Sequence, residues 1–385
     1  MCKCKFHISA NFYYYIIYIT LTDWFLSIYD INSIIQYRAI NMQSLTLKER
    51  FVRTLKGKEV DKVPVCSVTQ TATVEMMEVT GAKWPQAHYD PEKMATLAIA
   101  GHKLAGLEGI RFPFCTTVIA QTLGCKIDEG NIDTHPYQLS FPCADVKDVK
   151  NITVPENLCE SERISTVLKA AEIVRARVGE DIPLIAGMIG PAAVAFYLAG
   201  AQNYLMWCIQ HPDVLQELME IGTEVCVEYS NALFEHGLDA VNISDSEAGP
   251  DLFPVPMFES MVLPHYRKIT SRLQGLSILH ICGDATEILD QMAVSGFNGL
   301  SIEEKVNARY AKHMIGDRAC LIGNVSPTMA LLSKSPEFVK KEAKQCIEDG
   351  VGILAPGCGI EPHTSLENLQ AFVAARDEYY QGKVQ

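Results

Sequence analysis

Two short segments of the chain end in residues that could together bind a metal ion. Segment 276–282 ends in His280 and Cys282, which are two positions apart, so that both side chains lie on the same side of an extended strand. Segment 351–356 is followed by Cys358, which stands between two glycines and has little steric cover. One imidazole and two thiolates are a ligand set of open zinc sites, in which the fourth position stays free for substrate. The competing interpretation is that the cysteines are small buried apolar residues.

A carboxylate follows a third segment of the same kind. Segment 299–302 precedes Glu303 and Glu304, whose side chains point to opposite sides if the strand continues. We predict that Glu303 faces the same site, either as a fourth, exchangeable zinc ligand or as the group that orients His280. A solvated loop acid is the alternative interpretation.

Further polar residues follow other segments. Asp245 and Ser246 come after segment 240–244, and Asn324 lies near the end of segment 320–325, where barrels often bind anionic groups. We predict that Asp245, Ser246 and Asn324 bind the cofactor. Segment 187–191 precedes a predicted helix, whose N-terminal amides could hold an anion. Turn formation alone would also explain the glycines and prolines of these loops.

The segments that carry these residues belong to a regular alternation. Short runs rich in β-branched residues, bounded by glycine or proline, recur between longer stretches of helical periodicity. There are eight runs, at residues 63–68, 109–114, 183–188, 240–244, 276–282, 299–302, 320–325 and 351–356. Alternating strands and helices predict a parallel sheet, and eight strands in about 340 residues favour an α/β fold of the (β/α)8 TIM barrel type. Such barrels carry their active sites at the C-terminal ends of the strands.

Helix boundaries and one long connection extend this prediction. Thr46 and Glu49 form a capping-box pattern that predicts a helix through Leu55. Prolines are predicted to begin three later helices, at Pro91, Pro212 and Pro336. Residues 116–161 are too many for one connection between a strand and a helix, so we predict an insertion after the second strand, with a hairpin or extra helices.

Residues 1–41 differ from the rest of the chain. They carry a run of aromatic and β-branched residues, and their longest uncharged apolar stretch, residues 8–22, is shorter than the ~20 residues that cross a bilayer. Met42 has the position of an initiator methionine, because the predicted capping box at Thr46 follows shortly after it. We therefore predict a mistranslated or disordered leader over 1–41 and a single catalytic barrel domain over 42–385. A membrane anchor and a docked extra element are the alternatives.

The composition limits the partners and the compartment. Lys and Arg number 33 and Asp and Glu number 46, and the net charge of −13 argues against nucleic acid as a partner. The thirteen cysteines are irregularly spaced and no secretory cleavage pattern is present, which favours a reduced, cytoplasmic protein that has no membrane partner. No phosphate-binding loop, serine-hydrolase motif or zinc-protease motif competes with the predicted metal site.

As a set, these residues resemble the methylcobamide:coenzyme M methyltransferases of methanogenic archaea, in the uroporphyrinogen decarboxylase superfamily. The similarity runs from about Leu45 to the C-terminus. It is carried by residues 45–51, by His280 and Cys282 with the distant Cys358, by residues 300–306, and by Gly323 with Asn324. The leader has no counterpart in that family.

The resemblance implies a zinc enzyme that holds about one zinc ion per chain on His280, Cys282 and Cys358. It implies that a methyl group moves from the methylcobamide of a methylated corrinoid protein to the thiol of coenzyme M, giving methyl-coenzyme M in methanogenesis. Enzymes of the methanol and methylamine pathways share these motifs, and we favour the methanol pathway.

Two other functions are weighed against methyl transfer. Uroporphyrinogen decarboxylation on the same fold requires a loop that holds several substrate carboxylates, and the corresponding loop here, residues 67–73, has no basic residue. A non-catalytic scaffold that binds a corrinoid or zinc is the third hypothesis, and turnover of methylcobalamin with a thiol would exclude it.

Overall fold

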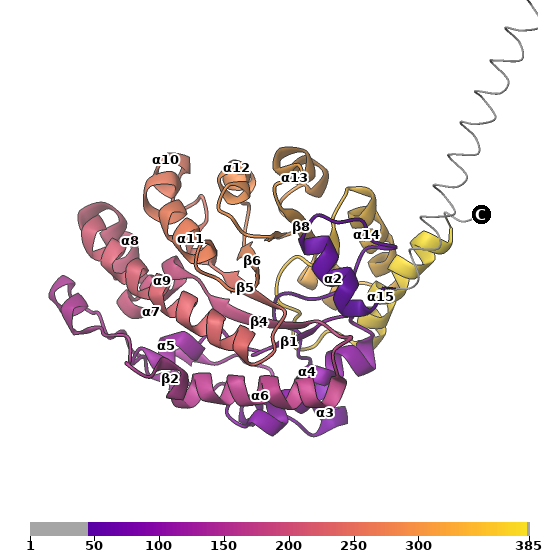
Figure 1. Cartoon of the computed structure of the whole chain (residues 1–385), viewed down its shortest axis with the longest axis horizontal. Helices are drawn as coiled ribbons and strands as arrows, with labels where there is room; N and C mark the ends of the chain where they lie inside the picture. Colours follow the sequence, from indigo (N-terminus) through magenta and orange to yellow (C-terminus); the bar gives the residue numbers. More distant parts are fainter. Residues whose placement is uncertain (1–44, 383–385) are drawn as a thin grey trace, which may run out of the picture. The chain divides into compact units, whose positions relative to one another are not determined.

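A curled parallel sheet lies at the centre of the structure, with helices around it (Figure 1). This computed structural model describes residues 45–382, so that the predicted leader lies outside the described residues. The main sheet has seven strands in the order β1-β4-β5-β6-β7-β8-β9. Their bounds are Ile110–Phe112 (β1), Leu184–Ile189 (β4), Ala240–Ser244 (β5), Leu276–Ile281 (β6), Gly299–Ile302 (β7), Cys320–Val325 (β8) and Ile353–Pro356 (β9). Because all neighbours pair in parallel, the C-terminal ends of the strands lie at one edge.

The first predicted strand is reduced to a single bridge. Val65 pairs in parallel with Leu354 of β9, where the Cys66 N–H donates to the Leu354 carbonyl at 3.1 Å. On the other side, the Glu108 N–H donates to the Val65 carbonyl at 2.8 Å, two residues before β1. Pro64 has no N–H, so that it cannot donate a further ladder hydrogen bond at the start of this segment. The segment lies between β9 and β1, at the two ends of the curled sheet.

Helices follow the strands, and the predicted helix starts are confirmed. Thr46 caps α2 with both hydrogen bonds of the capping box, and Pro91, Pro212 and Pro336 are the first residues of α4, α9 and α14. The α-helices are Leu47–Leu55 (α2), Val74–Thr80 (α3), Pro91–Ala105 (α4), Val118–Thr122 (α5), Glu162–Val178 (α6), Pro191–Ala199 (α7), Ala201–Gln210 (α8), Pro212–Glu235 (α9), Val255–Met257 (α10), Leu263–Thr270 (α11), Leu289–Ala293 (α12), Ala308–Ile315 (α13), Pro336–Glu348 (α14) and Leu366–Gln381 (α15).

The long connection between β1 and α6 contains several short elements. The helix α5 is followed by an antiparallel pair of two-residue strands, Ile127–Asp128 (β2) and Tyr137–Gln138 (β3). Two 3-10 helices, Val146–Asn151 and Leu158–Glu160, then lead to α6. These elements lie within residues 116–161, for which the sequence predicts an insertion with a hairpin or extra helices.

In the described part of the chain, no single helix combines the length and apolar character of a membrane span; α7 and α8, bent by 113° between them, meet those two measures only as a pair.

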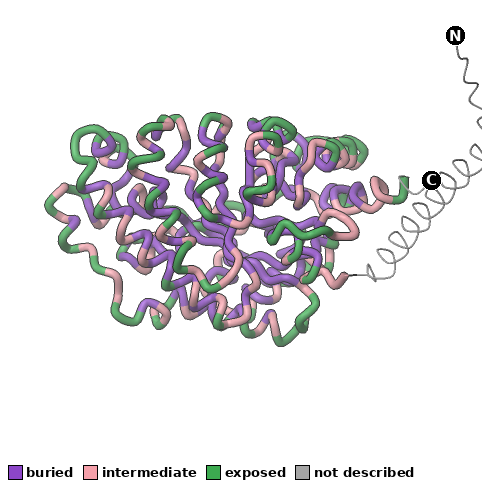
Figure 2. The backbone as a smooth tube through the Cα atoms, turned by 45° about the horizontal axis from the view of Figure 1, so that its top comes forward, coloured by how far each residue is buried: buried purple, intermediate pink, exposed green. Residues whose placement is uncertain are grey.

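Two clusters of buried apolar side chains lie on opposite faces of the sheet. Along β4, Ala186 belongs to the larger cluster between the sheet and the helices, whereas Ile185 belongs to the smaller one, because side chains alternate along a strand. The smaller cluster also contains Phe51 and Leu55 of α2, so that α2 packs against the inner face. Figure 2 shows the buried strands at the centre and the exposed residues on the outer helices and loops.

Buried ion pairs join α2, the start of β1 and α15. Arg50 and Arg376 both bind Glu108 Oε1, at 3.3 and 2.7 Å, and all three residues are buried. Arg50 also pairs with Asp61 at 2.7 Å, and Arg376 with Asp377 at 2.8 Å. Each buried guanidinium thus has two carboxylate partners, which offset the cost of removing the charges from water.

Replacing Glu108 by Gln should strongly destabilise the fold. Loss of one partner leaves buried charge uncompensated, and we expect the free energy of unfolding to fall by about 3–5 kcal/mol in urea denaturation. Glu180→Gln is the control, since its ion pair with Lys48 is exposed and should contribute ~1 kcal/mol or less. Equal effects of the two substitutions would contradict this account.

Candidate metal centre

His280, Cys282 and Cys358 come together at the C-terminal edge of the sheet. Their potential ligand atoms all lie within 4.8 Å of one another. Cys282 Sγ is 3.0 Å from His280 Nε2 and 3.2 Å from Cys358 Sγ. His280 is buried and both cysteines are partly exposed. The structure therefore groups the three residues that the sequence predicts as ligands, and their donor set fits a metal ion with one side open to solvent.

The register of the sheet orients the imidazole. His280 of β6 lies opposite Ser301 of β7, and His280 Nδ1 is 3.0 Å from Ser301 Oγ. This hydrogen bond fixes the ring so that Nε2 faces the two sulfur atoms. The sequence prediction missed Ser301, since its position opposite His280 depends on a register that one sequence does not reveal.

The two cysteines depend on glycines beside them. Gly283 has φ +82°, a left-handed conformation that turns the chain directly after Cys282. A Cβ at Gly357 would lie 3.0 Å from the backbone nitrogen of Glu304, so that the loop before Cys358 packs closely on its neighbour. Thr69 Oγ1 donates to the Cys358 carbonyl at 2.8 Å and holds this loop from the segment after Val65.

The contact between the sulfur atoms separates their acidities. A hydrogen bond from the Cys358 thiol, assisted by one from Ser246, lowers the pKa of Cys282 below its ordinary value. The same contact with Cys282, together with burial, raises the pKa of Cys358. Cys282 is therefore the sulfur that loses its proton more readily.

The two glutamates after β7 lie beside this centre in different ways. Glu303 Oε2 accepts a hydrogen bond from the Gly283 N–H, and Oε1 is 3.3 Å from Lys305 Nζ. Glu304 Oε1 accepts from the Ser326 hydroxyl at 2.7 Å, and its buried Oε2 has no hydrogen-bond partner among residues 45–382. Glu303 touches the residue next to Cys282, and its predicted role as fourth ligand stays a prediction.

Asp245 occupies the N-terminus of α7. Its carboxylate accepts hydrogen bonds from the N–H groups of Ala192 and Ala193, at 3.2 and 2.7 Å, and from the Tyr266 hydroxyl at 2.8 Å. A Cβ at Gly190 would overlap this carboxylate. The helix start that the sequence predicts as an anion site is thus occupied by a carboxyl side chain of the protein itself.

The other predicted cofactor-binding residues have protein partners as well. Ser246 hydrogen-bonds to Cys282. Asn324 Nδ2 donates to the carbonyls of Glu303 and Val306, at 3.2 and 2.8 Å, and so fixes the loop that carries Glu303. Cofactor binding by Asp245, Ser246 and Asn324 stays a prediction.

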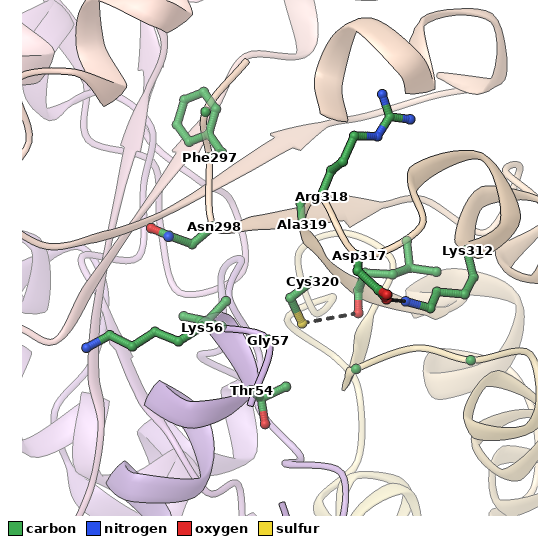
Figure 3. Close-up of a pocket in the computed structure, with 15 residues that line it drawn as sticks. Thr54, Lys56, Gly57, Phe297, Asn298, Lys312, Asp317, Arg318, Ala319 and Cys320 are labelled. Carbon is green, nitrogen blue, oxygen red and sulfur yellow. Dashed lines mark hydrogen bonds and ion pairs between the residues drawn. The ribbon is translucent and has the colours of Figure 1, made fainter. Parts of the chain in front are cut away.

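A cavity of about 600 Å³ lies at the opposite end of the strands (Figure 3). It includes Cys320, the first residue of β8, and therefore opens at the N-terminal edge. Two of the cations that line it, Lys312 and Arg318, already pair with Asp317 and Asp290 at 3.1 and 2.7 Å. The cavity is separate from the metal centre and has no comparable set of reactive groups.

The sequence of this chain also matches a known protein family. The sequence model of Uroporphyrinogen decarboxylase (URO-D) matches residues 46–379. The chain belongs to the uroporphyrinogen decarboxylase family. This match confirms the uroporphyrinogen decarboxylase superfamily that the sequence motifs indicate.

The similarity to known methyltransferases extends over 88% of the chain. The chain is 45% identical over 340 residues to the methylcobamide:CoM methyltransferase MtaA of Methanosarcina barkeri, covering 88% of this chain and 100% of the relative. It is 35% identical to the methylcobamide:CoM methyltransferase MtbA of Methanosarcina acetivorans, covering 88% and 99%. A solved methyltransferase from Methanosarcina mazei aligns with a TM-score of 0.85 at 45% identity, covering 88% and 100%.

We expect this uroporphyrinogen decarboxylase family member to bind about one zinc ion per chain. Cys282→Ala and Cys358→Ala should each abolish retention of the ion through gel filtration, because a three-ligand site loses a thiolate. Elemental analysis of the purified protein measures the metal content. Cys208→Ala, on α8, is the matched control and should retain the ion. Full retention by both ligand variants would contradict the assignment.

Asp245 should make the stability depend on pH. Burial raises its pKa from 3.8 to about 7, although the hydrogen bonds from Ala193 and Tyr266 oppose the shift. Between about pH 4 and pH 7 the folded state keeps a proton that the unfolded chain releases, so that stability falls as pH rises. Relative to Asp245→Asn, the free energy of unfolding should fall by ~1.4 kcal/mol per pH unit in this window. A difference between the two proteins that is the same at pH 5 and pH 7 in urea denaturation would contradict this.

Proposed function

We propose that this protein is a zinc-dependent methyltransferase that moves a methyl group from a methylated corrinoid protein to the thiol of coenzyme M. The product is methyl-coenzyme M. The observation that carries the proposal is the group of one imidazole and two thiols within 4.8 Å of one another. It occurs in a chain that is 45% identical to a methylcobamide:CoM methyltransferase over the whole length of that relative.

The proposal extends to the pathway. We assign the protein to methanogenesis from methanol rather than from methylamines. The identity of 45% to the MtaA enzyme, against 35% to the MtbA enzyme, supports this assignment.

The proposed ligands of the zinc ion are His280, Cys282 and Cys358, with Glu303 as an exchangeable fourth ligand. Two thiolates and one neutral imidazole balance the charge of Zn²⁺. When bound, the ion would lower the pKa of the coenzyme M thiol, which as a free thiol of pKa ~8.5 is mostly protonated at neutral pH.

The reaction is a displacement at the methyl carbon. The thiolate sulfur of coenzyme M attacks this carbon, so that a sulfur–carbon bond forms and the cobalt–carbon bond breaks. The electron pair of the broken bond stays on cobalt, which goes from Co(III) to Co(I), and the thiol proton leaves to solvent. Ser301 holds the His280 ring and the Gly283 N–H holds Glu303, so that the groups around the reacting sulfur are positioned before substrate arrives.

The proposed barrel closure supports this site. We propose that the segment at Val65 serves as the first of the eight strands of a (β/α)8 barrel and that the elements between β1 and α6 are an insertion after the second strand. The segment hydrogen-bonds to Leu354 on one side and to Glu108 on the other. Closure matters for function because Thr69, four residues later, binds the loop of Cys358.

Methyl transfer can be tested with methylcobalamin and coenzyme M. The zinc-loaded protein should form methyl-coenzyme M, detected by mass spectrometry, while the absorbance of methylcobalamin falls. Cys358→Ala should lower the rate at least ~100-fold, since metal-ion catalysis contributes several kcal/mol. Cys208→Ala should retain the full rate. If the zinc-loaded wild type transfers no methyl group from methylcobalamin or from a methylated corrinoid protein, the proposal fails.

A further inference from the structure

Arg111 is a buried cation that forms no ion pair within residues 45–382. The residue is 5% exposed, and its buried Nε has no hydrogen-bond partner. Its Nη1 donates to the Pro113 carbonyl, which is a neutral acceptor. The buried guanidinium groups of Arg50 and Arg376, by contrast, each bind two carboxylates. A buried charge without a counter-ion is costly, so that Arg111 calls for an anion from outside the chain.

The side chain of Arg111 lies inside the curled sheet. Arg111 of β1 is in register with Ile185 of β4, and neighbours in register point to the same face. Ile185 belongs to the inner apolar cluster. A Cβ at Gly187 would overlap the guanidinium, which places the charged group beyond Ile185 in the direction of the C-terminal edge. This is the edge that carries the metal centre.

A row of polar side chains on the same face connects Arg111 with His280. Gly187, which the guanidinium covers, is in register with Asn242 of β5. Asn242 Nδ2 donates to Ser244 Oγ at 3.0 Å, and the buried Oδ1 has no hydrogen-bond partner among the residues that the structure describes. Ser244 is in register with His280. Rotating the Asn242 amide by half a turn keeps its bond to Ser244, whose hydroxyl then donates, and presents Nδ2 as a free donor.

The thiol of Cys115, which interacts electrostatically with Arg111, is already engaged by another cation. Cys115 follows β1, and its Sγ is 3.2 Å from Arg163 Nη2. Although burial opposes it, the charges of His88 and Arg163 lower the pKa of this thiol to about 5. One thiolate thus acts on the guanidinium groups of both Arg111 and Arg163, so that positive charge remains in excess.

We infer that Arg111 binds the sulfonate of coenzyme M, with Asn242 as a neighbouring donor. This inference rests on the proposed function and assigns the group that positions its substrate. A sulfonate is permanently anionic, and two of its oxygens match the fork of a guanidinium group. With the sulfonate at Arg111, the thiol end of the substrate is directed along the inner face toward His280, Cys282 and Cys358.

The substrate pair coenzyme M and 2-mercaptoethanol isolates the sulfonate contact, because the second thiol lacks the sulfonate. Arg111→Met should lower kcat/KM for coenzyme M by roughly 10- to 100-fold, which corresponds to a lost charged hydrogen bond. It should leave kcat/KM for 2-mercaptoethanol within about threefold. Arg111→Lys, which keeps the charge without the fork, should fall between wild type and Arg111→Met. Arg318→Met, at the opposite end of the strands, should change neither value.

Calorimetry with ethanesulfonate separates this inference from the proposed function, since that ligand has no thiol and needs no turnover. The wild type should bind it, and Arg111→Met should not. Binding that depends on Arg111 without any methyl transfer would support the anion site and refute the function. Methyl transfer with equal losses for both thiols, or ethanesulfonate binding that survives Arg111→Met, would overturn the inference.

A purely structural Arg111 would give a different result in thermal unfolding. Removal of an uncompensated buried charge should leave Tm unchanged or raise it. A lower Tm of both Arg111→Met and Arg111→Lys, with equal losses for the two thiols, would assign Arg111 to the fold instead.

Discussion

The parallel register of β6 between β5 and β7 is the constraint on which the centre depends. It sets His280 opposite Ser301 on one side and Ser244 on the other, so that the imidazole is held at a fixed orientation before any ligand binds. The cysteines are then brought in by loops that follow the ends of β6 and β9. A displacement of β6 by one residue would turn His280 and Cys282 to the outer face and separate them from Cys358.

Buried charge is used differently at the two ends of the strands. Toward the N-terminal edge, Arg50 and Arg376 share Glu108 and each have a second carboxylate partner, and these ion pairs join helices from both ends of the described chain. Toward the C-terminal edge, Arg111 has no such partner and Glu304 Oε2 no hydrogen bond within the described part of the chain. The first arrangement stabilises the fold, whereas the second leaves buried polar groups without partners among the described residues, as is common at functional sites, which are less than optimally stable.

Much of this structure follows from local sequence patterns. The predicted strands after the first one agree with the structure to within two residues, because β-branched runs between glycines and prolines have few other conformations. His280 and Cys282 could be paired because residues two apart share a strand face. The residues that sequence analysis missed, Ser301 and Arg111, acquire their roles from strands that are distant in the chain. Their partners depend on the register and curvature of the sheet, which no short motif encodes.

The carboxylate of Asp245 at the start of α7 bears on how new specificities could arise in this protein. Many barrels catch phosphate groups with free backbone amides at a helix start, and a main-chain cradle of that kind is difficult to alter by point mutation. Here those amides already donate hydrogen bonds to the side chain of Asp245. Recognition of the charged end of a substrate then falls to side chains, which a single codon change can replace. Descendants of this protein could therefore exchange one small thiol acceptor for another while the methyl-transfer chemistry stays intact.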